Sequence, residues 1–405
     1  MDHEKRIVVL GSTGSIGENV LRIVESLPER FRIVGLAAGR QAERVVAQAA
    51  EFGVSRIALA DPAAAKKATE SLGNGARVLS GLEGVEALAT MPEADLVICA
   101  MVGMAALRPV LAAIEAGHDV ALATKEVLVA AGELVCSRAE AKGVNLLPID
   151  SEHSAIFQVL CGTKALPWCV RNRKTANEAP EAAEPLIEKL WLTASGGPFF
   201  FHPEIDFDTV TPSQALKHPR WRMGPKVTID SATMMNKGLE ILEARWLFNI
   251  PASRIGVLVH PESIVHSLVE FTDGAQLAQL GFPDMRVPIQ YAMSWPWRME
   301  NRTLPTLRLA EAATLHFSEP DVERFPSLRI VREASFKGGV ATCTMNAANE
   351  IAVEAFLEER IRFSDIWRMV GQVVEETPPC FGIPGLDALM EADSWARRRA
   401  KEMIG

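Results

Sequence analysis

The sequence predicts an α/β protein with a parallel sheet at its N-terminus, a mixed α+β middle and a helical C-terminal part. Three observations lead to this prediction. Strand-like and helix-like runs alternate through residues 1–150, both kinds of run are mixed through 151–300, and the last part is almost entirely helical in pattern. The chain has 405 residues, which is too long for one ordinary core. We therefore predict domains over 1–150, 151–300 and 327–405, with a linker over 301–326.

The first part alternates short β-branched runs with amphipathic runs of helical length. Strands are expected at 6–10, 32–36, 56–60, 95–100, 118–121 and 144–147, and helices at 16–27 and 41–52. Strands that alternate with helices at this spacing form a parallel sheet covered on both faces. This alternation predicts the α/β class.

The middle and last parts have other patterns. In the middle, strands are expected at 189–193, 227–230, 255–260, 264–271 and 274–280, a helix at 238–248, a hairpin turn at Thr272-Asp273-Gly274 and an exposed loop over the polar run 171–184. In the last part, helices are expected at 327–337, 345–358, 363–375 and 386–403. Four such helices are typical of a small bundle.

Composition narrows the function classes. The net charge is −9 and the pI is about 5.5, which argues against broad, unspecific binding of nucleic acid. The chain has no apolar run of 18 residues, and a strand-like run begins within the first ten residues. We therefore expect neither a membrane span nor a signal peptide. The six cysteines form no CxxC pair, which is typical of reduced thiols in a cytoplasmic protein.

A glycine-rich turn follows the first strand-like run. Glycines let the backbone turn tightly and approach a pyrophosphate, and the N-terminus of the next helix favours that anion. The spacing is G-x-x-G-x-x-G rather than G-x-G-x-x-G, but its place between a strand and a helix predicts a Rossmann-like dinucleotide site. The residues expected to contact the dinucleotide here are Gly11, Thr13, Gly14, Ser15, Ile16 and Gly17.

The end of the second strand indicates which dinucleotide is bound. An NAD enzyme usually ends this strand with an acid that binds the ribose 2′-hydroxyl. Here Gly39, Arg40 and Gln41 follow the strand, and no acid is present. A guanidinium attracts a 2′-phosphate that a carboxylate would repel. The sequence therefore favours NADPH.

Carboxylates follow the last strand of the first part. Asp150 and Glu152 come two residues apart where that strand ends, which is the edge of an α/β sheet where ligands bind. Glu240 lies far downstream, in the run DSATMMNKGLE. Three carboxylates suit a hard cation such as Mg²⁺ or Mn²⁺. The spacing does not by itself bring Glu240 to Asp150, and helix capping or solvated helix faces remain an alternative reading of these acids.

Eight segments resemble the 1-deoxy-D-xylulose 5-phosphate reductoisomerase family, in the order that this family shows. They are GSTGSIG, KEVLV, PIDSEHSAIFQ, SGGPF, KHPRWRMGPKVTIDSATMMNKGLEILEA, HPESIVHSLVEF, GFPDMRVPI and MNAANEIAVEAF, and together they span roughly residues 7–360. The resemblance implies conversion of 1-deoxy-D-xylulose 5-phosphate to 2-C-methyl-D-erythritol 4-phosphate in isoprenoid synthesis outside the mevalonate route. It implies NADPH, a divalent metal (Mg²⁺, Mn²⁺ or Co²⁺) and a homodimer, with no nucleic-acid or membrane partner.

The resemblance also implies roles for individual residues. The implied metal ligands are Asp150, Glu152 and Glu240, which with Lys125 would carry the catalysis. The implied substrate contacts are Lys125, Ser151, Glu152, Ser195, His218, Ser231, Asn236, Lys237 and Glu240, together with Trp221 and Met223 on a lid near 215–226. Further implied cofactor contacts are Thr124, Glu126 and Gly224.

The lid region and a few positions differ from the family pattern. Arg220 and Arg222 stand where smaller polar residues are common, and with Lys226 they would attract an anionic substrate. Thr124 stands where the family usually has asparagine, which leaves a cofactor-ribose contact open. The segment 165–188 is longer than is usual in the family.

Three histidines are further candidates for metal ligands. For His260 and His266, which flank a strand-like run, we favour a structural or interface role, and for His153 a structural role.

Two alternative functions stay open. The first is another NADPH-dependent dehydrogenase of a phosphorylated substrate, which would not need three carboxylates. The second is a non-catalytic dinucleotide sensor, which would be expected to have lost at least one of the metal-type acids or Lys125.

Overall fold

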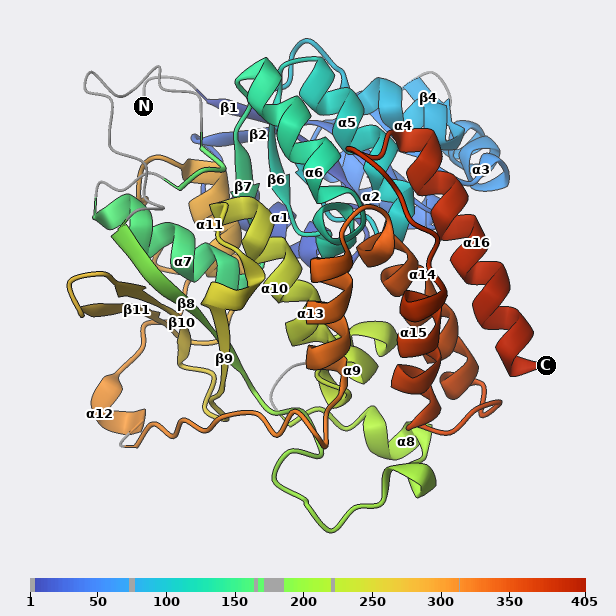
Figure 1. The fold of residues 1–405 in the computed structure, drawn as a ribbon. Coiled ribbons are helices and arrows are strands. Elements are labelled where there is room, and N and C mark those ends of the chain that lie inside the picture. Colours follow the sequence, from blue (N-terminus) through green and yellow to red (C-terminus); the bar gives the residue numbers. More distant parts are fainter. Residues whose placement is uncertain (1–3, 73–76, 164–166, 171–185, 220–222, 313) are drawn as a thin grey trace. The chain divides into compact units, whose positions relative to one another are not determined.

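The computed structural model describes residues 4–72, 77–163, 167–170, 186–219, 223–312 and 314–405 (Figure 1). The chain forms two compact units. The first comprises Met1–Val127, Val135–Ala182 and Pro283–Thr306, and the second comprises Leu128–Leu134, Ala183–Phe282 and Leu307–Gly405. The division into three domains stays a prediction. The expected loop 171–184 and the lid residues Arg220, Trp221 and Arg222 lie outside the described residues.

The first unit contains a parallel sheet of seven described strands, in the order β4-β3-β2-β1-β5-β6-β7. The strands are β1 (Lys5–Leu10), β2 (Phe31–Ala38), β3 (Arg56–Leu59), β4 (Arg77–Ser80), β5 (Leu96–Cys99), β6 (Asp119–Leu122) and β7 (Leu146–Pro148). Six of them were predicted, whereas β4 was missed. It is only four residues long and none of its residues is fully buried, so it lacks the apolar run that marks the other strands.

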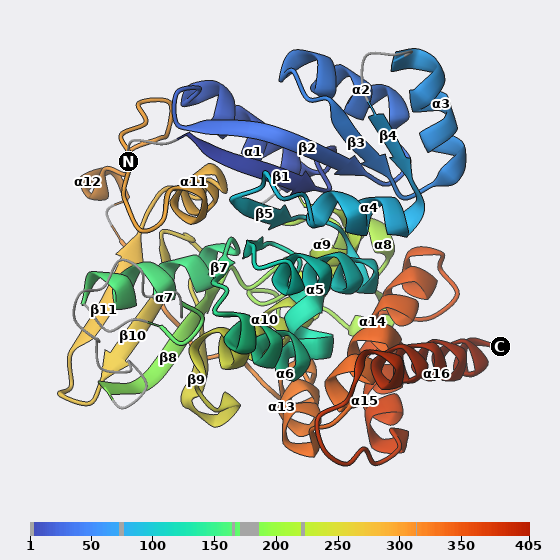
Figure 2. The same cartoon turned by 90° about the horizontal axis from the view of Figure 1, so that it is seen from above.

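Helices connect and cover these strands. They are α1 (Ser15–Ser26), α2 (Ala42–Glu51), α3 (Pro62–Leu72), α4 (Gly81–Ala89), α5 (Leu107–Glu115), α6 (Lys125–Lys142), α7 (Ser151–Gly162) and α11 (Arg286–Ser294), with a short 3₁₀ helix at Gly103–Ala106. Helix α6 also supplies the stretch Leu128–Leu134 to the second unit and is kinked at Ala131. Figure 2 shows β2, β3 and β4 following one another across the sheet, next to α2 and α3.

The strand order reverses between β1 and β5. The chain adds strands outward from β1 to β4, returns to the other side of β1, and then adds β5, β6 and β7 in the opposite direction. A reversal of this kind leaves a crevice at the carboxyl ends of the two central strands, where ligands of doubly wound sheets bind. Strands β1 and β5 are fully buried along their length past Arg6, which confirms the predicted α/β class with a Rossmann-like first part.

The second unit contains a mixed sheet in the order β11-β10-β8-β9. Its strands are β8 (Ile187–Ala194), β9 (Ile255–Val259), β10 (Val265–Phe271) and β11 (Gln276–Leu280). β8 and β9 are parallel, whereas β10 is antiparallel to both β8 and β11. The predicted hairpin turn joins β10 to β11, and Gly274 adopts the positive φ of 87° that the turn requires. Strand β11 is an edge of this sheet.

Helices make up the rest of the second unit. They are α8 (Pro212–Ala215), α9 (Pro225–Ala232), α10 (Met235–Phe248), α12 (Leu309–Ala312), α13 (Ser327–Lys337), α14 (Ala341–Leu357), α15 (Asp365–Glu376) and α16 (Leu386–Ile404), with 3₁₀ turns at Phe207–Thr209 and Ala252–Arg254. The four predicted C-terminal helices are confirmed, although α14 begins at Ala341 rather than Met345. Figure 1 shows α14, α15 and α16 side by side, and these helices are in contact.

The strand expected at 227–230 is wrong, because these residues lie in α9. Gly224 caps this helix and Pro225 occupies its first turn, where the fixed φ of proline favours a helix start. The Thr228 hydroxyl donates to the Gly224 carbonyl at 3.0 Å, which stabilises a β-branched residue in the helix. The helix start therefore overrides the local preference for a strand.

The helices and the cysteines bear on the kind of protein this is. Among the described residues, no helix combines the length and the apolar character that a membrane crossing needs. The six cysteines are all free, and burial raises the pKa of the Cys99 and Cys161 thiols to about 11. These thiols are therefore protonated and unreactive near neutral pH.

Candidate functional site

The turn between β1 and α1 contains three glycines, two of which leave no room for a side chain. Gly11 has a φ of 93°, and a Cβ atom on it would lie 2.4 Å from the Ala100 carbonyl oxygen. A Cβ on Gly17 would lie 2.4 Å from the Gly11 carbonyl oxygen. Gly14 differs, because it is exposed and a Cβ there would meet its nearest atom at 3.5 Å. Gly11 and Gly17 therefore shape the turn, while Gly14 leaves the outer side of the turn open to a ligand.

The start of α1 offers backbone N–H groups to that open side. Gly14 is the N-cap of α1 and provides no side chain to cap it. Ser15 is exposed, whereas Thr13 and Ile16 are half-buried. Free N–H groups at a helix start, together with the helix dipole, bind an anion such as a pyrophosphate. The structure thus brings the six predicted residues of this turn together.

A buried polar contact supports the turn, and the sequence analysis missed it. The Ser12 hydroxyl donates to Gln48 Oε1 at 2.8 Å, and Gln48 Nε2 donates to the Ser12 carbonyl at 3.1 Å. Gln48 Nε2 also donates to Glu18 at 2.9 Å, and Arg44 binds the same carboxylate through two nitrogens. Hydrogen bonding to Arg44 lowers the pKa of Glu18. The signal in the sequence would have been a glutamine on the apolar face of the predicted helix.

The residues after β2 form an exposed edge. Gly39 and Gln41 are exposed, and Gln41 precedes α2. The Arg40 side chain is 89% exposed, and its Nε lies 3.8 Å from an oxygen of Asp61. An exposed ion pair of this length contributes little to stability. Most of the Arg40 guanidinium surface is therefore available to an anionic ligand.

Thr124 and Glu126 lie at the start of α6. The Thr124 hydroxyl is buried and donates to the carbonyl of Met101 in the loop after β5. A threonine hydroxyl has a single proton to donate. The contact therefore fixes this loop against α6 and uses the one proton that the threonine can donate. An asparagine at this position would have two amide protons to donate. Glu126 is also buried, in the first turn of the same helix.

Four predicted residues meet at the carboxyl ends of β6 and β7. Lys125 Nζ lies 2.8 Å from Asp150 Oδ2, and both side chains are mostly buried. Asp150 is the N-cap of α7 and accepts a hydrogen bond from the Ser151 N–H at 3.0 Å. The Ser151 hydroxyl donates to Glu152. The structure therefore places two carboxylates, a lysine and a hydroxyl at one edge of the sheet, and their roles as site residues stay a prediction.

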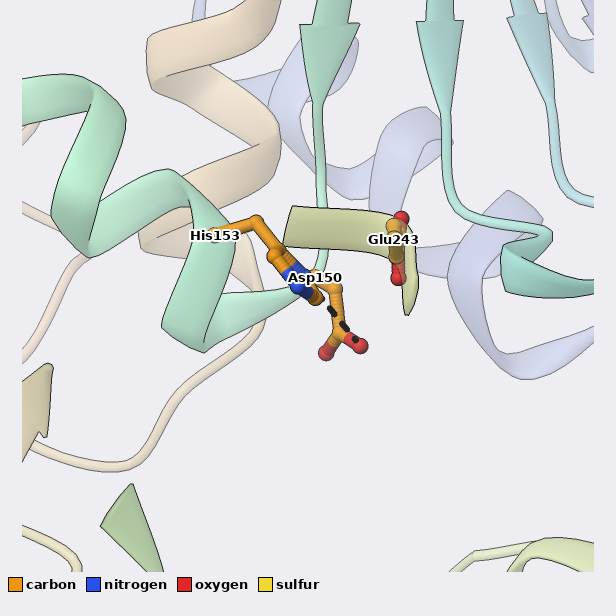
Figure 3. A group of neighbouring side chains, drawn as sticks. All are labelled: Asp150, His153 and Glu243. Atoms are coloured by element: carbon orange, nitrogen blue, oxygen red, sulfur yellow. Dashed lines mark ion pairs between the residues drawn. The ribbon is translucent and has the colours of Figure 1, made fainter. Parts of the chain in front are cut away.

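His153 lies beside this cluster, in the first turn of α7. Figure 3 shows its imidazole next to the Asp150 carboxylate, and Nδ1 lies 3.9 Å from Oδ2. This distance is too long for a hydrogen bond. The ring is fully buried, which fits the structural role that we favoured. Figure 3 also draws Glu243, a buried residue of α10 in the second unit.

In the second unit, Ser195 and His218 are hydrogen-bonded. Ser195 follows β8, and its Oγ lies 3.0 Å from His218 Nε2. Gly196 and Gly197 come next, both with positive φ, and the Gly197 N–H donates to the Ser195 hydroxyl at 3.3 Å. Burial lowers the pKa of His218, so its ring is neutral near pH 7. A hydroxyl and a neutral imidazole in contact are suitable donors to a phosphate.

The turn between α9 and α10 carries the next group of predicted residues. A Cβ on Gly197 would lie 2.7 Å from the Ser231 carbonyl oxygen, so the turn after Ser195 is packed against the end of α9. Met234 has a φ of 62° and makes the sharp turn into α10. Asn236 Nδ2 donates to Glu240 Oε1 at 2.6 Å, and Lys237 forms an ion pair with the other oxygen. Lys237 and Glu240 are both buried.

The predicted metal ligands belong to both units. Asp150 and Glu152 lie in the first unit, and Glu240 lies in the second. Asp150 and Glu240 each contact a lysine, and these lysines supply the positive charge that a buried carboxylate needs. Carboxylates in this number are the ligands that a hard divalent cation prefers. The donor set therefore fits the predicted metal.

Of the predicted lid residues and the histidine His260, the structure describes all but Trp221 and its two neighbours. Met223 is half-buried, and Gly224 is exposed at the start of α9, whereas Trp221 lies outside the described residues. His260 uses both ring nitrogens within the fold. Its Nδ1 is 2.8 Å from the His316 carbonyl, and its Nε2 accepts from two backbone N–H groups, each at 3.1 Å. These bonds agree with the structural role that we favoured for His260.

A doubly wound sheet with a glycine turn for a pyrophosphate and an arginine at its ribose edge defines a dinucleotide-dependent oxidoreductase of the NADP type. Comparison with known families is more specific. Residues 7–132 match the 1-deoxy-D-xylulose 5-phosphate reductoisomerase model, and residues 146–248 and 280–399 match two C-terminal domain models of the same enzyme. The chain belongs to the 1-deoxy-D-xylulose 5-phosphate reductoisomerase family.

Relatives match along the whole chain. The 1-deoxy-D-xylulose 5-phosphate reductoisomerase of Chlorobaculum tepidum is 48% identical over 402 residues, which cover 99% of this chain and 100% of that protein. The enzyme of Symbiobacterium thermophilum is 49% identical over 404 residues and 98% of each chain. Among solved structures, the Zymomonas mobilis enzyme in complex with NADPH superposes with a TM-score of 0.87 at 38% identity, covering 100% of this chain and 99% of that one.

A second solved structure bears on the ligands. It is a DOX-P reductoisomerase in complex with NADPH, fosmidomycin and magnesium, and it superposes with a TM-score of 0.90 at 39% identity over 99% of this chain and 98% of that one. These likenesses confirm the predicted family and the predicted fold class.

Proposed function

We propose that the protein converts 1-deoxy-D-xylulose 5-phosphate and NADPH to 2-C-methyl-D-erythritol 4-phosphate and NADP⁺, with the help of a divalent cation. The observation that carries the proposal is full-length membership of this family, in a chain that also offers two candidate anion sites. One is the glycine turn of the first unit, and the other is the α9–α10 turn of the second. A dinucleotide and a phosphorylated sugar each require such a site.

NADPH supplies the hydride of the reduction. Its pyrophosphate would lie over Gly14 at the start of α1, on the outer side of the turn that Gly11 and Gly17 shape. Arg40 would bind the 2′-phosphate, because the guanidinium is exposed and its ion pair with Asp61 is long. The similar structures solved with NADPH support NADPH as the cofactor. Gly39, Gln41, Thr124, Glu126 and Gly224 complete the proposed cofactor contacts.

A divalent cation held by Asp150, Glu152 and Glu240 would act as a Lewis acid and as a template for adjacent substrate oxygens. Lys125 and Lys237 already lie against two of these carboxylates. A lysine beside a metal-binding carboxylate would help to stabilise negative charge that develops on the substrate oxygens. The relative solved with magnesium supports Mg²⁺ as one metal that suits this donor set.

The substrate phosphate is proposed to bind in the second unit. Ser195 and His218 offer a hydroxyl and a neutral imidazole, and the start of α10 offers Asn236, Lys237 and a helix dipole. Ser231 lies between these groups along the chain and is packed against Gly197. Lys125, Ser151 and Glu152 would contact the sugar end of the substrate. Trp221 and Met223 are proposed to belong to a lid that excludes water.

The overall change balances as one rearrangement and one reduction. Breaking and rejoining a carbon–carbon bond turns the linear keto sugar into a branched aldehyde with the same atoms. One hydride from NADPH and one proton from solvent then convert the aldehyde to the alcohol. The three carboxylates and Lys125 are all present, so the chain has lost none of the residues that a non-catalytic sensor could dispense with.

Two broader assignments complete the proposal. A homodimer would be formed through the second unit, where β11 is an edge strand and Leu277, Leu280 and Phe282 are exposed. Exposed apolar side chains along an open strand edge favour pairing with another copy. A cytoplasmic location is supported by the six free cysteines.

The test follows NADPH absorbance in purified protein with 1-deoxy-D-xylulose 5-phosphate. Parallel samples contain Mg²⁺, Mn²⁺, EDTA, or NADH in place of NADPH. We expect oxidation that needs both the metal and the sugar phosphate and that is slow with NADH. Fast oxidation with NADH would contradict the role of Arg40, and full activity in EDTA would contradict the metal site. Tight NADPH binding without oxidation under any metal would favour a sensor.

A further inference from the structure

A buried hydrogen bond joins the C-terminal helix α14 to α9, the helix that precedes the proposed phosphate site. Asn349 Nδ2 donates to Asp230 Oδ1 at 2.8 Å, across a separation of 119 residues in sequence. Asn349 is 0% exposed and Asp230 is 1% exposed. The other carboxylate oxygen of Asp230 lies 2.9 Å from Lys226 Nζ, one turn earlier on α9. Both oxygens of this carboxylate therefore have a fixed partner.

These contacts fix the orientation of the last turn of α9. An ionised carboxylate is costly to bury, and the cost is offset only when its partners are held in good geometry. Lys226 belongs to the same helix and turns with it, so it cannot fix the helix against its surroundings. Asn349 comes from a different helix, α14, and can therefore fix α9 against its surroundings. Of these two partners of Asp230, Asn349 is therefore the one that sets the rotation of α9 relative to α14.

The last turn of α9 leads directly into the proposed phosphate site. Asp230 is followed by Ser231, and its carbonyl accepts from the Thr233 hydroxyl at 3.2 Å. The same hydroxyl accepts from the Met235 N–H, at 3.3 Å, at the start of α10. A chain of hydrogen bonds thus runs from Asp230 to the first turn of α10, where Asn236 and Lys237 lie. A small rotation of α9 would be passed to these donors.

Helix α14 is anchored independently on its other side. Asn346 Nδ2 donates to Glu350 at 3.0 Å, Glu350 forms an ion pair with Arg397 of α16, and Arg397 also binds Asp393 at 2.8 Å. Asn349 is not one of the residues that form this chain of contacts. Helix α14 is therefore a support that α16 holds in place, and Asn349 is the point where the support reaches α9.

We propose that Asn349 is a positioning residue of the phosphate site, which acts by orienting Asp230 and thereby Ser231, Asn236 and Lys237. This inference rests on the proposed function, because it assumes that the α9–α10 turn binds a phosphate. It assigns the C-terminal helices a specific role in substrate binding beyond general stability. Groups that bind a substrate lose affinity steeply when they are displaced by a fraction of an ångström, so the effect should appear in phosphate affinity.

The test compares Asn349→Ala with the matched control Asn346→Ala. Both changes remove a fully buried asparagine from α14, but only the first removes the bond to Asp230. We expect Asn349→Ala to raise KM for 1-deoxy-D-xylulose 5-phosphate roughly tenfold, the size expected for a lost hydrogen bond to a charged group, and to change kcat much less. Asn346→Ala should keep KM within about twofold of the wild-type value, because its bond leads away from α9.

A second measurement does not depend on turnover. Inorganic phosphate is titrated calorimetrically into each protein with NADPH at saturation, which blocks the cofactor site. The Kd for phosphate should rise roughly tenfold in Asn349→Ala and stay unchanged in Asn346→Ala. If the wild-type protein binds phosphate but turns over no substrate, the proposed function fails while the phosphate titration still decides the inference.

A double variant separates positioning from loss of folding. Asp230→Asn combined with Asn349→Asp restores an amide–carboxylate bond in the reverse sense, and it should recover part of the phosphate affinity lost in Asn349→Ala. Thermal unfolding of each variant records its stability. Equal phosphate Kd values for wild type, Asn349→Ala and Asn346→Ala would overturn the inference. So would equal losses in both single variants, because such losses would follow from a weakened bundle alone.

Discussion

The two proposed anion sites of this protein are built in opposite ways. The proposed cofactor site would use backbone N–H groups from one short stretch of chain, Gly11–Gly17, at the end of a buried strand. The proposed phosphate site uses side chains that come from the turn after β8, from the region before α9 and from α10. Its donors are held by further contacts, one of which reaches α14.

This difference determines which substitutions each site tolerates. A site made of backbone depends on the absence of side chains, so adding a single methyl group is harmful where space is lacking. A site made of side chains depends on specific groups and on the contacts that orient them, so removing one group is harmful. The first site should be sensitive to gains of volume and the second to losses of hydrogen bonds.

The largest expected effect is at the buried carboxylate of the second site. Glu240→Gln removes a proposed metal ligand and the anion that Lys237 contacts. We expect kcat/KM to fall by about 10³-fold, the size seen when an electrostatic group of an active site is lost. The Kd for NADPH, measured by fluorescence, should stay unchanged. Activity near the wild-type level in the same Mg²⁺ concentration would remove Glu240 from the metal site.

The next largest effect is expected at a glycine of the first site. Gly17→Ala places a methyl group 2.4 Å from the Gly11 carbonyl oxygen, so α1 must shift. We expect about 1–3 kcal/mol of lost stability and NADPH binding weakened by roughly a hundredfold. Gly14→Ala is the matched control, because its methyl group meets the nearest atom at 3.5 Å. It should weaken NADPH binding while leaving the unfolding temperature unchanged.

An equal loss of unfolding temperature in both glycine variants would show that Gly14 is also a structural glycine. The outer side of the turn would then not be reserved for a ligand.

A smaller effect is expected at the ribose edge of the first site. Arg40→Ala should weaken NADPH binding by roughly tenfold and leave NADH binding unchanged, because the guanidinium is proposed to contact only the 2′-phosphate. Stability should not change, since the side chain is 89% exposed. Kd values for both dinucleotides and an unfolding curve provide the measurement. An equal loss for both dinucleotides would assign Arg40 to a part of the cofactor that they share.

The smallest effect distinguishes the two sites by pH. Burial lowers the pKa of His218, so the folded state binds this proton less readily than the unfolded state. Its contribution to stability is present above the unfolded pKa of about 6.5 and is lost as the pH falls through the lower, folded value. Between pH 7.5 and 5.5 the wild type should therefore lose about 1–2 °C more in unfolding temperature than His218→Gln.

The control for this prediction is NADPH binding, which should respond equally to pH in both proteins. An identical pH dependence of unfolding in the two proteins would contradict the burial of His218.

The same contrast explains what could be predicted from the sequence. The glycine turn between a strand and a helix could be predicted from the sequence, because its requirement is local and glycine is the residue that meets it. The residues of the second site followed only from the family resemblance, because nothing in their spacing indicates that Ser195 contacts His218. The supports of both sites were missed. Gln48 lies 36 residues from Ser12, and Asn349 lies 119 residues from Asp230, so no local pattern connects them.

The fold shows the same limits. The buried parallel strands and the amphipathic C-terminal helices were predicted because their apolar periodicity is strong. Strand β4 was missed because it is short and only half-buried. Residues 227–230 were expected to be a strand from their β-branched content, but the proline at the start of α9 decides for a helix. Local propensity therefore failed where a neighbouring residue or a distant contact sets the structure.

The central claim is that one chain both rearranges and reduces a phosphorylated sugar. Carbon NMR of ¹³C-labelled 1-deoxy-D-xylulose 5-phosphate, incubated with the protein, NADPH and Mg²⁺, tests this claim most directly. We predict a product with a branched carbon skeleton, in which the methyl group is attached to a carbon that also bears a hydroxyl and two further carbons, formed in equal amount to NADP⁺. A reduced product with the original linear skeleton would contradict the account and would identify a simple dehydrogenase instead.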